Sequence, residues 1–460
     1  MNRSSTQKFP NQFYLQLILW IYQLVWIMGL PFVLLFFIKK SLKEPSYRRA
    51  FLERFGFGKS NLFGAIWVHA VSLGEFRAAV PLVRNLLKMS EKVLITTITP
   101  AGREEAKKTL KKEIDEDLVQ VLYLPFEFGF CFRLFFKRHR PKFGIILEYE
   151  LWPILIVSSS KAKVPLVLAQ AKYNERSFFR DKNSFPIRGR LLDGFKLILA
   201  KSELHASRFR YFTDTNVEVM GELRFEQPIP SEQLHKANHF LNVADFKNTG
   251  RTCLCMGSTG QGEDEKLFYV MEQINKRVCE LGIPKPFYIY VPRHKRYYDK
   301  IKKLSIEKKL VLSKRSEILD ENLKKGVEFE NFLKQIHLFD GMVGDSFGEI
   351  NFYFQMADCI FIGDSFNDLG CHNIIEPLAL KKPVVVGPST RNIEYPLIEA
   401  LRVDIVKKVN NPDELIEYWL RFIMGDESSR KSITKVDSFY SEHSGATDKC
   451  IKHLKKGGLL

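Results

Sequence analysis

The stretch that decides the fold is 363-GDSFNDLGCHNIIEP-377, followed closely by an apolar run at 383–386. It is typical of a strand end, a glycine-containing loop and a helix start, with the next strand immediately after. In an α/β protein such a loop lies at the carboxyl end of the sheet, where ligands bind. Glycine lets backbone N–H groups approach an anion, and Glu376 in the first helical turn can accept hydrogen bonds from ribose hydroxyls. The stretch indicates a nucleotide-sugar site, although an ordinary loop with a helix-capping glutamate has the same pattern.

The composition is that of a globular protein with excess positive charge. The chain has 460 residues, 45% of them hydrophobic and 27% charged, so two domains are expected. The formal net charge of +17 favours an anionic partner such as nucleic acid, a membrane surface or a phosphorylated substrate. The seven cysteines form no CxxC pair and several lie in apolar runs, which predicts reduced, buried thiols and no structural zinc site.

An uncharged apolar segment occupies residues 13–38 near the N-terminus. It exceeds the roughly 20 residues that cross a bilayer, so we expect a single-pass anchor within residues 1–40. Basic residues are more frequent after the segment than before it, which places the body of the protein in the cytoplasm. Pro31 could kink the segment, and an interfacial or re-entrant helix is the alternative.

Beyond the anchor, short apolar segments alternate with amphipathic helical patterns, which predicts parallel α/β architecture. A stretch at 226–248 opens with two prolines and predicts a junction between two doubly wound, Rossmann-like halves that face each other across a cleft. The charged stretch 300–335 shows no clear strand and is interpreted as partly an insertion. Strands are expected at 66–71, 93–97, 121–124, 143–147, 164–169, 197–200, 217–220, 252–256, 287–291, 341–343, 359–362 and 384–386.

The first candidate for chemistry is 69-HAVSLGE-75, between an apolar strand and an amphipathic helix. Glu75 would stand at the helix N-terminus, where the helix dipole favours the ionised carboxylate. Such a carboxylate in a cleft can accept the proton of an attacking hydroxyl. The S-x-x-E spacing fits a capping box formed by Ser72 and Glu75 equally well.

Two further strand ends in the first half carry polar motifs. The hydroxyls, glycine and helix start of 96-TTITPAG-102 could bind an anion or a sugar, or form an N-cap with proline at the first helical position. The motif 148-EYELWP-153 sets two carboxylates beside an aromatic ring, a combination common in sugar sites. Its alternative is a pair of solvated loop acids with Trp152 packed in the core.

Three more loops end strands in the second half. The glycine-rich 257-GSTGQGE-263 suits a phosphate, but it lacks the GK[ST] ending of a P-loop and is not GxGxxG. In 292-PRH-294, Arg293 could meet a phosphate and His294 could hydrogen-bond it, unless they are a surface arginine and a capping histidine. The loop 344-GDSFGE-349 again precedes a helix. Together with 363–377, these loops would converge on one crevice.

The combination resembles the 3-deoxy-D-manno-oct-2-ulosonic acid (Kdo) transferases of lipopolysaccharide synthesis, which are glycosyltransferases of the GT-B architecture. The matching elements cover nearly the whole chain in the expected order. They are the N-terminal anchor, WVHAVSLGE (67–75), TTITPAG (96–102), ILEYELWP (146–153), GELRFE (221–226), GSTGQGEDE (257–265), VPRH (291–294), GDSFGE (344–349), GDS…GCHNIIEP (363–377) and VVVGPSTRN (384–392).

The resemblance implies inverting transfer of Kdo from CMP-Kdo to the lipid A precursor (lipid IVA), without a metal or cofactor. Glu75 matches the family's general base, and the ExELWP motif implies a second important acid, Glu148 or Glu150. The acceptor is expected to meet Ser72, Gly74, Thr97 and Trp152. The donor is expected to meet Gly257, Ser258, Thr259, Arg293, His294, Gly348, Glu349, His372, Asn373 and Glu376.

The resemblance also implies a location and a domain plan. The catalytic domains would be cytoplasmic, at the inner membrane, where the cytoplasmic leaflet holds the acceptor; nucleic acid is not expected as a partner. The anchor would be 1–40, the acceptor-binding domain 41–228 and the CMP-Kdo-binding domain 229–460. A final helix from about residue 430 could pack back on the first domain.

The sequence departs from the family pattern GGS…GGHNxxEP, because Asp364 and Cys371 replace glycines. Asp364 brings a negative charge near a site for an anionic donor, so either its side chain points away or the local backbone differs. Two rival functions stay open. One is another GT-B enzyme, such as a UDP-sugar transferase or epimerase; an epimerase would not need the anchor. The other is a membrane-tethered anion-binding protein, which would leave Glu75 and Glu376 without a task.

Overall fold

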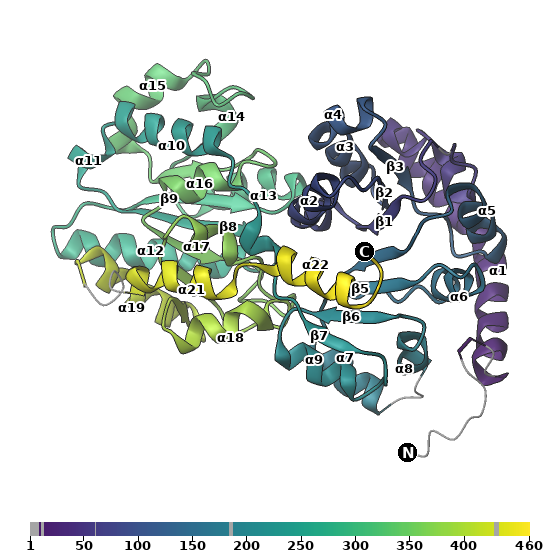
Figure 1. Cartoon of the computed structure of the whole chain (residues 1–460). Helices are drawn as coiled ribbons and strands as arrows, with labels where there is room; N and C mark the ends of the chain where they lie inside the picture. The colour runs from purple at the N-terminus through teal and green to yellow at the C-terminus, as the bar shows by residue number, and fades with distance from the viewer. Residues whose placement is uncertain (1–8, 11–12, 60, 184–186, 427–431) are drawn as a thin grey trace. The chain divides into compact units, whose positions relative to one another are not determined.

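The computed structural model describes residues 9–10, 13–59, 61–183, 187–426 and 432–460 (Figure 1). Backbone contacts divide the chain into two compact units: Met1–Gln227 with His443–Leu460, and Pro228–Glu442. Within the described residues, each unit contains a parallel sheet of seven strands. The predicted α/β class with two Rossmann-like domains is confirmed.

The sheet of the first unit reverses its winding direction between two neighbouring strands. Its order is β3-β2-β1-β4-β5-β6-β7, so the chain builds outward from β1 on one side and from β4 on the other. Ligands bind at such a switch point, beyond the carboxyl ends of the strands. The strands are β1 (Ile66–His69), β2 (Val93–Thr97), β3 (Val119–Tyr123), β4 (Gly144–Leu147), β5 (Leu166–Ala171), β6 (Leu197–Ala200) and β7 (Val217–Val219).

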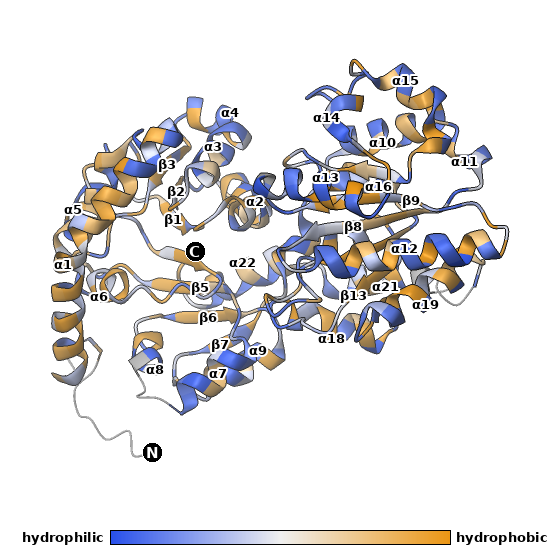
Figure 2. Ribbon diagram, turned by 180° about the vertical axis from the view of Figure 1, so that it is seen from behind, coloured by the Kyte–Doolittle hydropathy of each residue, from blue (hydrophilic) through white to orange (hydrophobic). Residues whose placement is uncertain are grey.

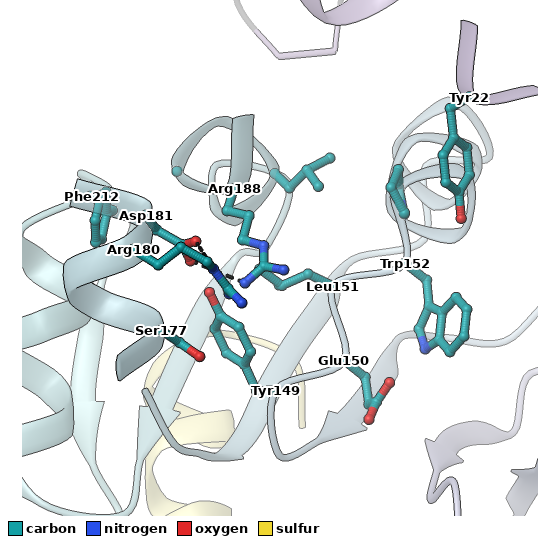
Figure 3. Close-up of a pocket in the computed structure, with 13 residues that line it drawn as sticks. Tyr22, Tyr149, Glu150, Leu151, Trp152, Ser177, Arg180, Asp181, Arg188 and Phe212 are labelled. Atoms are coloured by element: carbon teal, nitrogen blue, oxygen red, sulfur yellow. Dashed lines mark hydrogen bonds and ion pairs between the residues drawn. The ribbon is translucent and has the colours of Figure 1, made fainter. Parts of the chain in front are cut away.

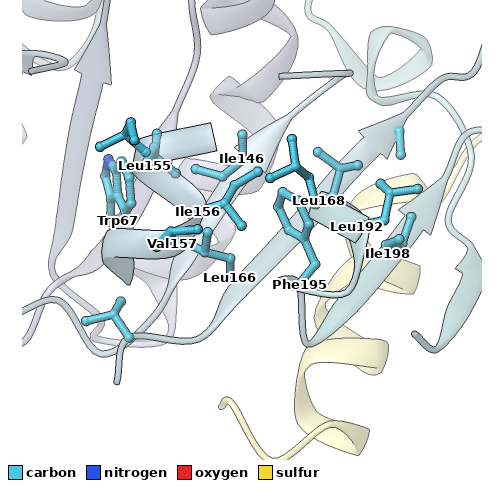
Figure 4. Close-up of a cluster of buried hydrophobic side chains, with 14 of the residues drawn as sticks. Trp67, Ile146, Leu155, Ile156, Val157, Leu166, Leu168, Leu192, Phe195 and Ile198 are labelled. Atoms are coloured by element: carbon cyan, nitrogen blue, oxygen red, sulfur yellow. The ribbon is translucent and has the colours of Figure 1, made fainter. Parts of the chain in front are cut away.

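Helices cover both faces of this sheet, because alternate strand residues point to opposite sides. Trp67 of β1 belongs to the apolar layer under α6, shown in Figure 4, whereas Ile66 and Val68 belong to the layer under α2 and α22. The helices of the first unit are α1 (Phe13–Lys43), η1 (Pro45–Tyr47), η2 (Phe51–Phe55), α2 (Leu73–Lys88), α3 (Pro100–Thr109), α4 (Lys111–Asp115), α5 (Gly129–His139), α6 (Pro153–Lys161), α7 (Glu175–Lys182), α8 (Ile187–Leu192), α9 (Glu203–Arg210), η3 (Leu223–Glu226) and α22 (Ala446–Lys456).

The second unit repeats this plan. Its order is β10-β11-β9-β8-β12-β13-β14, with the switch point between β8 and β12. The strands are β8 (Cys253–Thr259), β9 (Phe287–Pro292), β10 (Leu312–Lys314), β11 (Gly341–Val343), β12 (Cys359–Ile362), β13 (Val384–Val386) and β14 (Val406–Lys408). The helices are α10 (Ser231–Val243), α11 (Phe246–Thr249), α12 (Asp264–Glu280), η4 (Lys295–Tyr297), α13 (Tyr298–Glu307), α14 (Arg315–Ile318), α15 (Phe329–Lys334), η5 (Ile336–Leu338), α16 (Ile350–Met356), α17 (Ile375–Ala379), α18 (Glu394–Arg402), α19 (Pro412–Ile423), η6 (Ser432–Lys435) and α21 (Val436–His443).

The structure corrects the expectation that 300–335 contains no strand. β10 pairs in parallel with β11, so this charged stretch completes one edge of the second sheet. At the other edge β14 pairs with β13 and was not predicted either. Edge strands need only one buried face, and both of these are three residues long with lysines in them, so neither forms an apolar run.

The helix α1 is the apolar segment that was predicted to be an anchor. Among the described residues it alone is long and apolar enough to cross a membrane. Figure 2 shows it almost entirely in the hydrophobic colour along the edge of the first unit.

Candidate active site

Glu75 stands directly beyond β1, in the first turn of α2. The Ser72 hydroxyl oxygen accepts the Glu75 N–H at 3.5 Å, and the Glu75 carboxylate accepts the Val71 N–H at 2.8 Å and the Ser72 O–H at 3.2 Å. Ser72 caps α2, but the Glu75 carboxylate returns to the N–H of Val71, one residue before the N-cap, so the predicted capping box is only half formed. The cap therefore exists, and it fixes the position of the carboxylate that was predicted to be a base.

The surroundings of Glu75 disfavour its charge. Burial raises the pKa of Glu75 to about 7, and the carboxylates of Glu148 and Glu150 raise it as well, against the opposing Val71 N–H. The helix N-terminus was expected to keep Glu75 ionised, but burial and the two neighbouring acids outweigh it. A carboxylate with a pKa near neutrality is well matched to proton transfer at physiological pH.

The 96–102 motif supports the loop that carries Glu75. Thr99 caps α3 by accepting the Gly102 N–H at 3.1 Å, and Pro100 takes the first helical position, as the N-cap interpretation had it. A Cβ atom at Gly102 would lie 3.2 Å from the Leu73 nitrogen, so glycine permits this close approach. Thr97 was predicted to face the acceptor, but it is buried in β2 and its hydroxyl donates to the Thr99 carbonyl.

Glu148 is enclosed in a buried ion cluster at the ends of β4 to β7. Its carboxylate pairs with Lys172, with Lys201 at 3.4 Å and with Arg224 at 3.1 Å. Burial alone would raise the pKa of Glu148, but these three cations hold it well below its ordinary value. Glu222 pairs with the same Lys201 at 2.8 Å. The left-handed backbone of Glu148, with φ 62°, turns its side chain into the cluster.

Glu150 occupies a different environment two residues later. It is partly exposed, and burial together with Glu148 raises its pKa, with the neighbouring Trp152 side chain acting in the opposite direction. Glu150 and Trp152 both line a cavity of about 850 Å3 in the first unit (Figure 3). The alternative interpretation of Trp152 as a core residue is thus only partly right, because the ring is half-buried and faces this cavity.

The cavity combines aromatic rings with positive charge. Arg180 and Arg188 both pair with Asp181 at 3.1 Å, so two guanidinium groups share one carboxylate. Tyr22 reaches the cavity from α1. The remaining lining comes from the 149–153 loop, α7, α8 and the end of α9: Tyr149, Glu150, Leu151, Trp152, Pro153, Ser177, Gly189, Leu191 and Phe212.

In the second unit, one buried carboxylate joins the two loops at the switch point. Glu263 accepts the N–H groups of Gly260, Asp364, Ser365 and Phe366, at 2.5–3.1 Å. Burial raises the pKa of Glu263, and these N–H groups oppose the rise. Glu263 belongs to the glycine-rich motif 257–263, but no role was predicted for its side chain. Its position at the end of that motif, immediately before α12, is the signal that could have identified it.

Asp364 replaces a family glycine without disturbing the left-handed backbone that glycine favours, since its φ is 58°. Its carboxylate accepts hydrogen bonds from His372 at 2.7 Å and from Asn367 at 2.9 Å. Burial acts in the other direction, but these bonds hold the pKa of Asp364 below its ordinary value. The side chain fits because residue 260 is glycine: a Cβ atom there would lie 1.5 Å from an Asp364 oxygen.

Arg293, His294 and Glu376 lie near the hydrogen-bonded pair of Asp364 and His372. Burial lowers the pKa of Arg293, and the charges of Asp364 and Glu376 oppose the change. Burial and the two neighbouring arginines, Arg293 and Arg296, lower the pKa of His294. Glu376 is half-buried in the first turn of α17. The second unit thus gathers side chains from the ends of β9 and β12 that were predicted to meet a donor.

Of the other predicted donor residues, some pack in the interior of the second unit and others are exposed to solvent. Gly257 lies inside β8, where a Cβ atom would meet the Phe354 ring at 2.4 Å, and Thr259 is buried. Ser258 is partly exposed and Gly348 is exposed, both with left-handed backbone. Asn373 accepts the N–H of Ile375, the first residue of α17, at 3.0 Å.

Glu349 forms a buried ion pair with Arg315 at 2.6 Å. Arg315 begins α14 in the charged stretch 300–335, and sequence reasoning missed it because that stretch was interpreted as an insertion. Nothing in its local pattern distinguishes Arg315 from the surrounding basic residues. No group of three or more histidine, cysteine, aspartate or glutamate side chains within the described ranges could hold a metal ion.

Two Rossmann-like units with acids at one switch point and glycine loops at the other define a nucleotide-sugar enzyme of the GT-B architecture. A family model described as 3-deoxy-D-manno-octulosonic-acid transferase (kdotransferase) matches residues 49–227. This match and the relatives below support a glycosyltransferase similar to the Kdo transferases of lipopolysaccharide synthesis.

Relatives match over both units. A 3-deoxy-D-manno-octulosonic acid transferase of Bordetella pertussis is 28% identical over 86% of this chain and 87% of its own length. The enzyme of the same name from Haemophilus influenzae is also 28% identical, over 92% and 95%. A glycosyltransferase structure from Rickettsia africae covers 86% of this chain and 98% of its own, with a TM-score of 0.55 and 14% identity, which supports the fold.

Proposed function

We propose that the enzyme transfers Kdo from CMP-Kdo to the lipid A precursor, with Glu75 as the general base. The observation that carries this proposal is the raised pKa of Glu75 at the switch point of the first unit, held by its cap and flanked by Glu150. A base must accept a proton at physiological pH and keep a fixed position, and Glu75 meets both requirements.

The step is an inverting displacement. The acceptor hydroxyl oxygen forms the new bond to the anomeric carbon of Kdo, while the bond from that carbon to the phosphate oxygen of CMP breaks. The hydroxyl proton passes to the Glu75 carboxylate, and CMP leaves with the bonding electron pair. Burial, together with the charges of Glu148 and Glu150, keeps the pKa of Glu75 high, which makes it a stronger base once ionised. Glu148, neutralised by three cations, acts as a positioning residue that fixes the 148–152 loop.

Donor binding is assigned to the second unit. Arg293 offers a cation for the phosphate or the Kdo carboxylate, and Glu376 offers acceptor oxygens for the ribose hydroxyls. His372 is oriented by its hydrogen bond to Asp364. Ser258, His294 and Gly348 remain exposed enough to contact the donor. Gly257, Thr259, Glu349 and Asn373 shape the loops from within.

Acceptor binding is assigned to the cavity of the first unit. The acceptor is a phosphorylated glycolipid, and this cavity offers Arg180 and Arg188 for phosphate and Trp152 for a sugar face. Ser72 and Gly74 border Glu75, where the attacking hydroxyl must approach. The acceptor lies in the cytoplasmic leaflet of the inner membrane, so the proposal places both units on the cytoplasmic side.

The experiment incubates the purified, detergent-solubilised enzyme with CMP-Kdo and a tetra-acylated lipid A precursor, and follows CMP release and product mass. Glu75→Gln is compared with Glu116→Gln, an exposed carboxylate on the same unit. We expect glycolipid heavier by one or more Kdo units, lost by a factor of about 10² or more only in Glu75→Gln. Unchanged turnover in that variant refutes the assigned base. Product from a UDP-sugar instead of CMP-Kdo refutes the donor.

A further inference from the structure

The helix α1 packs against the first unit along one face for most of its length. The residues that it buries or half-buries recur every three or four positions, as one face of a helix requires. Leu15 and Leu19 belong to the main core of the unit, and the later residues pack on a smaller cluster around Phe126 and Phe128. The docked face comprises Leu15, Leu19, Tyr22, Trp26, Leu30, Val33 and Phe37.

A polar contact fixes the middle of this face. The Gln23 side chain donates to the Glu127 carbonyl at 2.6 Å and accepts the Gly129 N–H at 3.2 Å, so both ends of its amide are satisfied by the unit. The buried Glu127 carboxylate accepts the N–H groups of Ile154 and Leu155 at 2.9 and 3.0 Å. α1 is thus connected through Glu127 to the start of α6, next to the Trp152 loop.

Aromatic contacts hold the second half of the helix. Trp26 lies 5.6 Å from Phe128 and 6.5 Å from Phe126, measured between ring centres. Phe37 lies 5.7 Å from Phe126 and 5.6 Å from Phe51. Each such pair stabilises the packing beyond the area that it buries. Detaching α1 would expose this cluster and leave the Gln23 contacts unmade.

The docked length leaves no free segment that could cross a bilayer. From Leu15 to Phe37 the helix rises about 33 Å at 1.5 Å per residue. A span takes roughly 20 residues, and the α1 residues that pack on the unit are spread along this whole length, from Leu15 to Phe37. Crossing would therefore require α1 to detach, or the Phe126–Phe128 segment with the Glu127 carboxylate to enter the hydrocarbon.

The opposite face of α1 is apolar and exposed. Trp20 is 78% exposed, and Val25, Met28 and Phe32 are 61–73% exposed. The exposed apolar surface continues on the body of the unit: Phe130 stacks on Phe128 and is 51% exposed, and Leu52 next to Phe51 is 66% exposed. Basic residues follow at the end of the helix: Lys39, Lys40, Lys43, Arg48 and Arg49.

We infer that α1 is a monotopic helix that lies in the plane of one leaflet. Its exposed face enters the acyl layer, and the basic residues that follow it contact anionic headgroups. Because Pro31 could kink the segment, an interfacial helix was the alternative to a single-pass span. The inferred arrangement is that alternative. Tyr22, which reaches the substrate cavity, then holds that cavity at the level of the headgroups.

The test determines on which side of the membrane each end of the chain lies. The full-length enzyme is expressed with different epitope tags at its two ends, and protease is added to sealed spheroplasts and to inverted vesicles. We expect both tags to resist digestion in spheroplasts and both to be lost in inverted vesicles. Tags on opposite sides of the membrane would overturn the inference.

A second measurement tests the lipid contact independently of catalysis. Val25→Glu on the exposed face is compared with Val327→Glu, which is 97% exposed on the second unit. Membranes are washed at high salt and the retained enzyme is quantified. We expect Val25→Glu to lower retention at least several-fold and Val327→Glu to leave it unchanged. Equal retention of the two variants, or loss of the unmodified enzyme from the membranes, would also overturn the inference.

Discussion

The Glu150 carboxylate raises the pKa of Glu75, although the two residues belong to motifs 75 positions apart in the chain. The two meet because β1 and β4, which precede them, pair directly at the switch point of the first sheet. Beyond its own burial, the pKa of the proposed base therefore depends on charges that the loop after another strand supplies.

This relationship predicts the pH dependence of transfer. Only ionised Glu75 can accept a proton, so kcat/KM should fall about tenfold per pH unit below an inflection near pH 7. Glu150→Gln removes a negative charge that raises this pKa, so the inflection should move to lower pH. Glu116→Gln, at an exposed site, should leave it in place. The measurement is a pH profile of kcat/KM for the three proteins, and an unmoved inflection in Glu150→Gln contradicts the coupling.

A second prediction separates the two tasks of the Ser72 cap. Ser72→Ala and Ser202→Ala each remove a serine that accepts an N–H at a helix start, and each should cost about 1 kcal/mol of stability. Ser72 also donates to the Glu75 carboxylate, so Ser72→Ala alone should lower kcat. Thermal unfolding and steady-state kinetics measure both effects. Equal kcat in the two variants would show that the cap has no part in positioning the base.

A third prediction concerns the ion cluster around Glu148. Lys201→Met removes the buried cation that Glu148 and Glu222 share and leaves them only the more exposed Arg224 to share, so it should destabilise the first unit by about 3–5 kcal/mol. Lys142→Met breaks a half-exposed pair with Glu91 and should cost at most about 1 kcal/mol. Urea unfolding followed by tryptophan fluorescence measures both. Similar midpoints for the two variants would contradict the cluster's role in stability.

A fourth prediction tests the fit between Gly260 and Asp364. Gly260→Ala places a Cβ atom where the Asp364 carboxylate lies, so it should displace that group from His372 and weaken CMP binding about tenfold or more. Asp364→Gly in the same chain removes the clash and should restore most of the affinity. Gly129→Ala, where a Cβ atom meets nothing within 4 Å, serves as the control. Calorimetric titration with CMP measures the affinity of each variant. If the double variant does not regain CMP affinity, the predicted clash between residues 260 and 364 is contradicted.

The sequence predicted those features that depend on local pattern. Apolar runs located the central strands, such as 93–97, because strands buried on both faces are continuously hydrophobic. The short edge strands β10 and β14 were not predicted, because each is only three residues long and contains lysine, so neither forms a continuous hydrophobic run. Residue spacing also predicted the caps at Ser72 and Thr99 correctly.

The properties that pattern could not predict depend on long-range packing. The motif did not distinguish Glu148 from Glu150, since the cations that neutralise Glu148 come from the ends of β5 and β6 and from η3. Thr97 carries the hydroxyl expected of a ligand contact, but the strand places it in the interior. The pKa of Glu75 depends on burial, which competes with the helix dipole and has no local signature.

The return of α22 to the first unit has a consequence for synthesis. Ala446, Cys450, Ile451 and Leu454 belong to the same apolar layer as the core of α2, and the Thr447 N–H donates to Glu226 at 3.0 Å. The first unit therefore begins at the ribosome before the second but can complete its core only after the last helix has been translated. A chain stopped within residues 443–445 would retain the whole second unit, yet it would leave the helix that carries Glu75 without its packing partner α22.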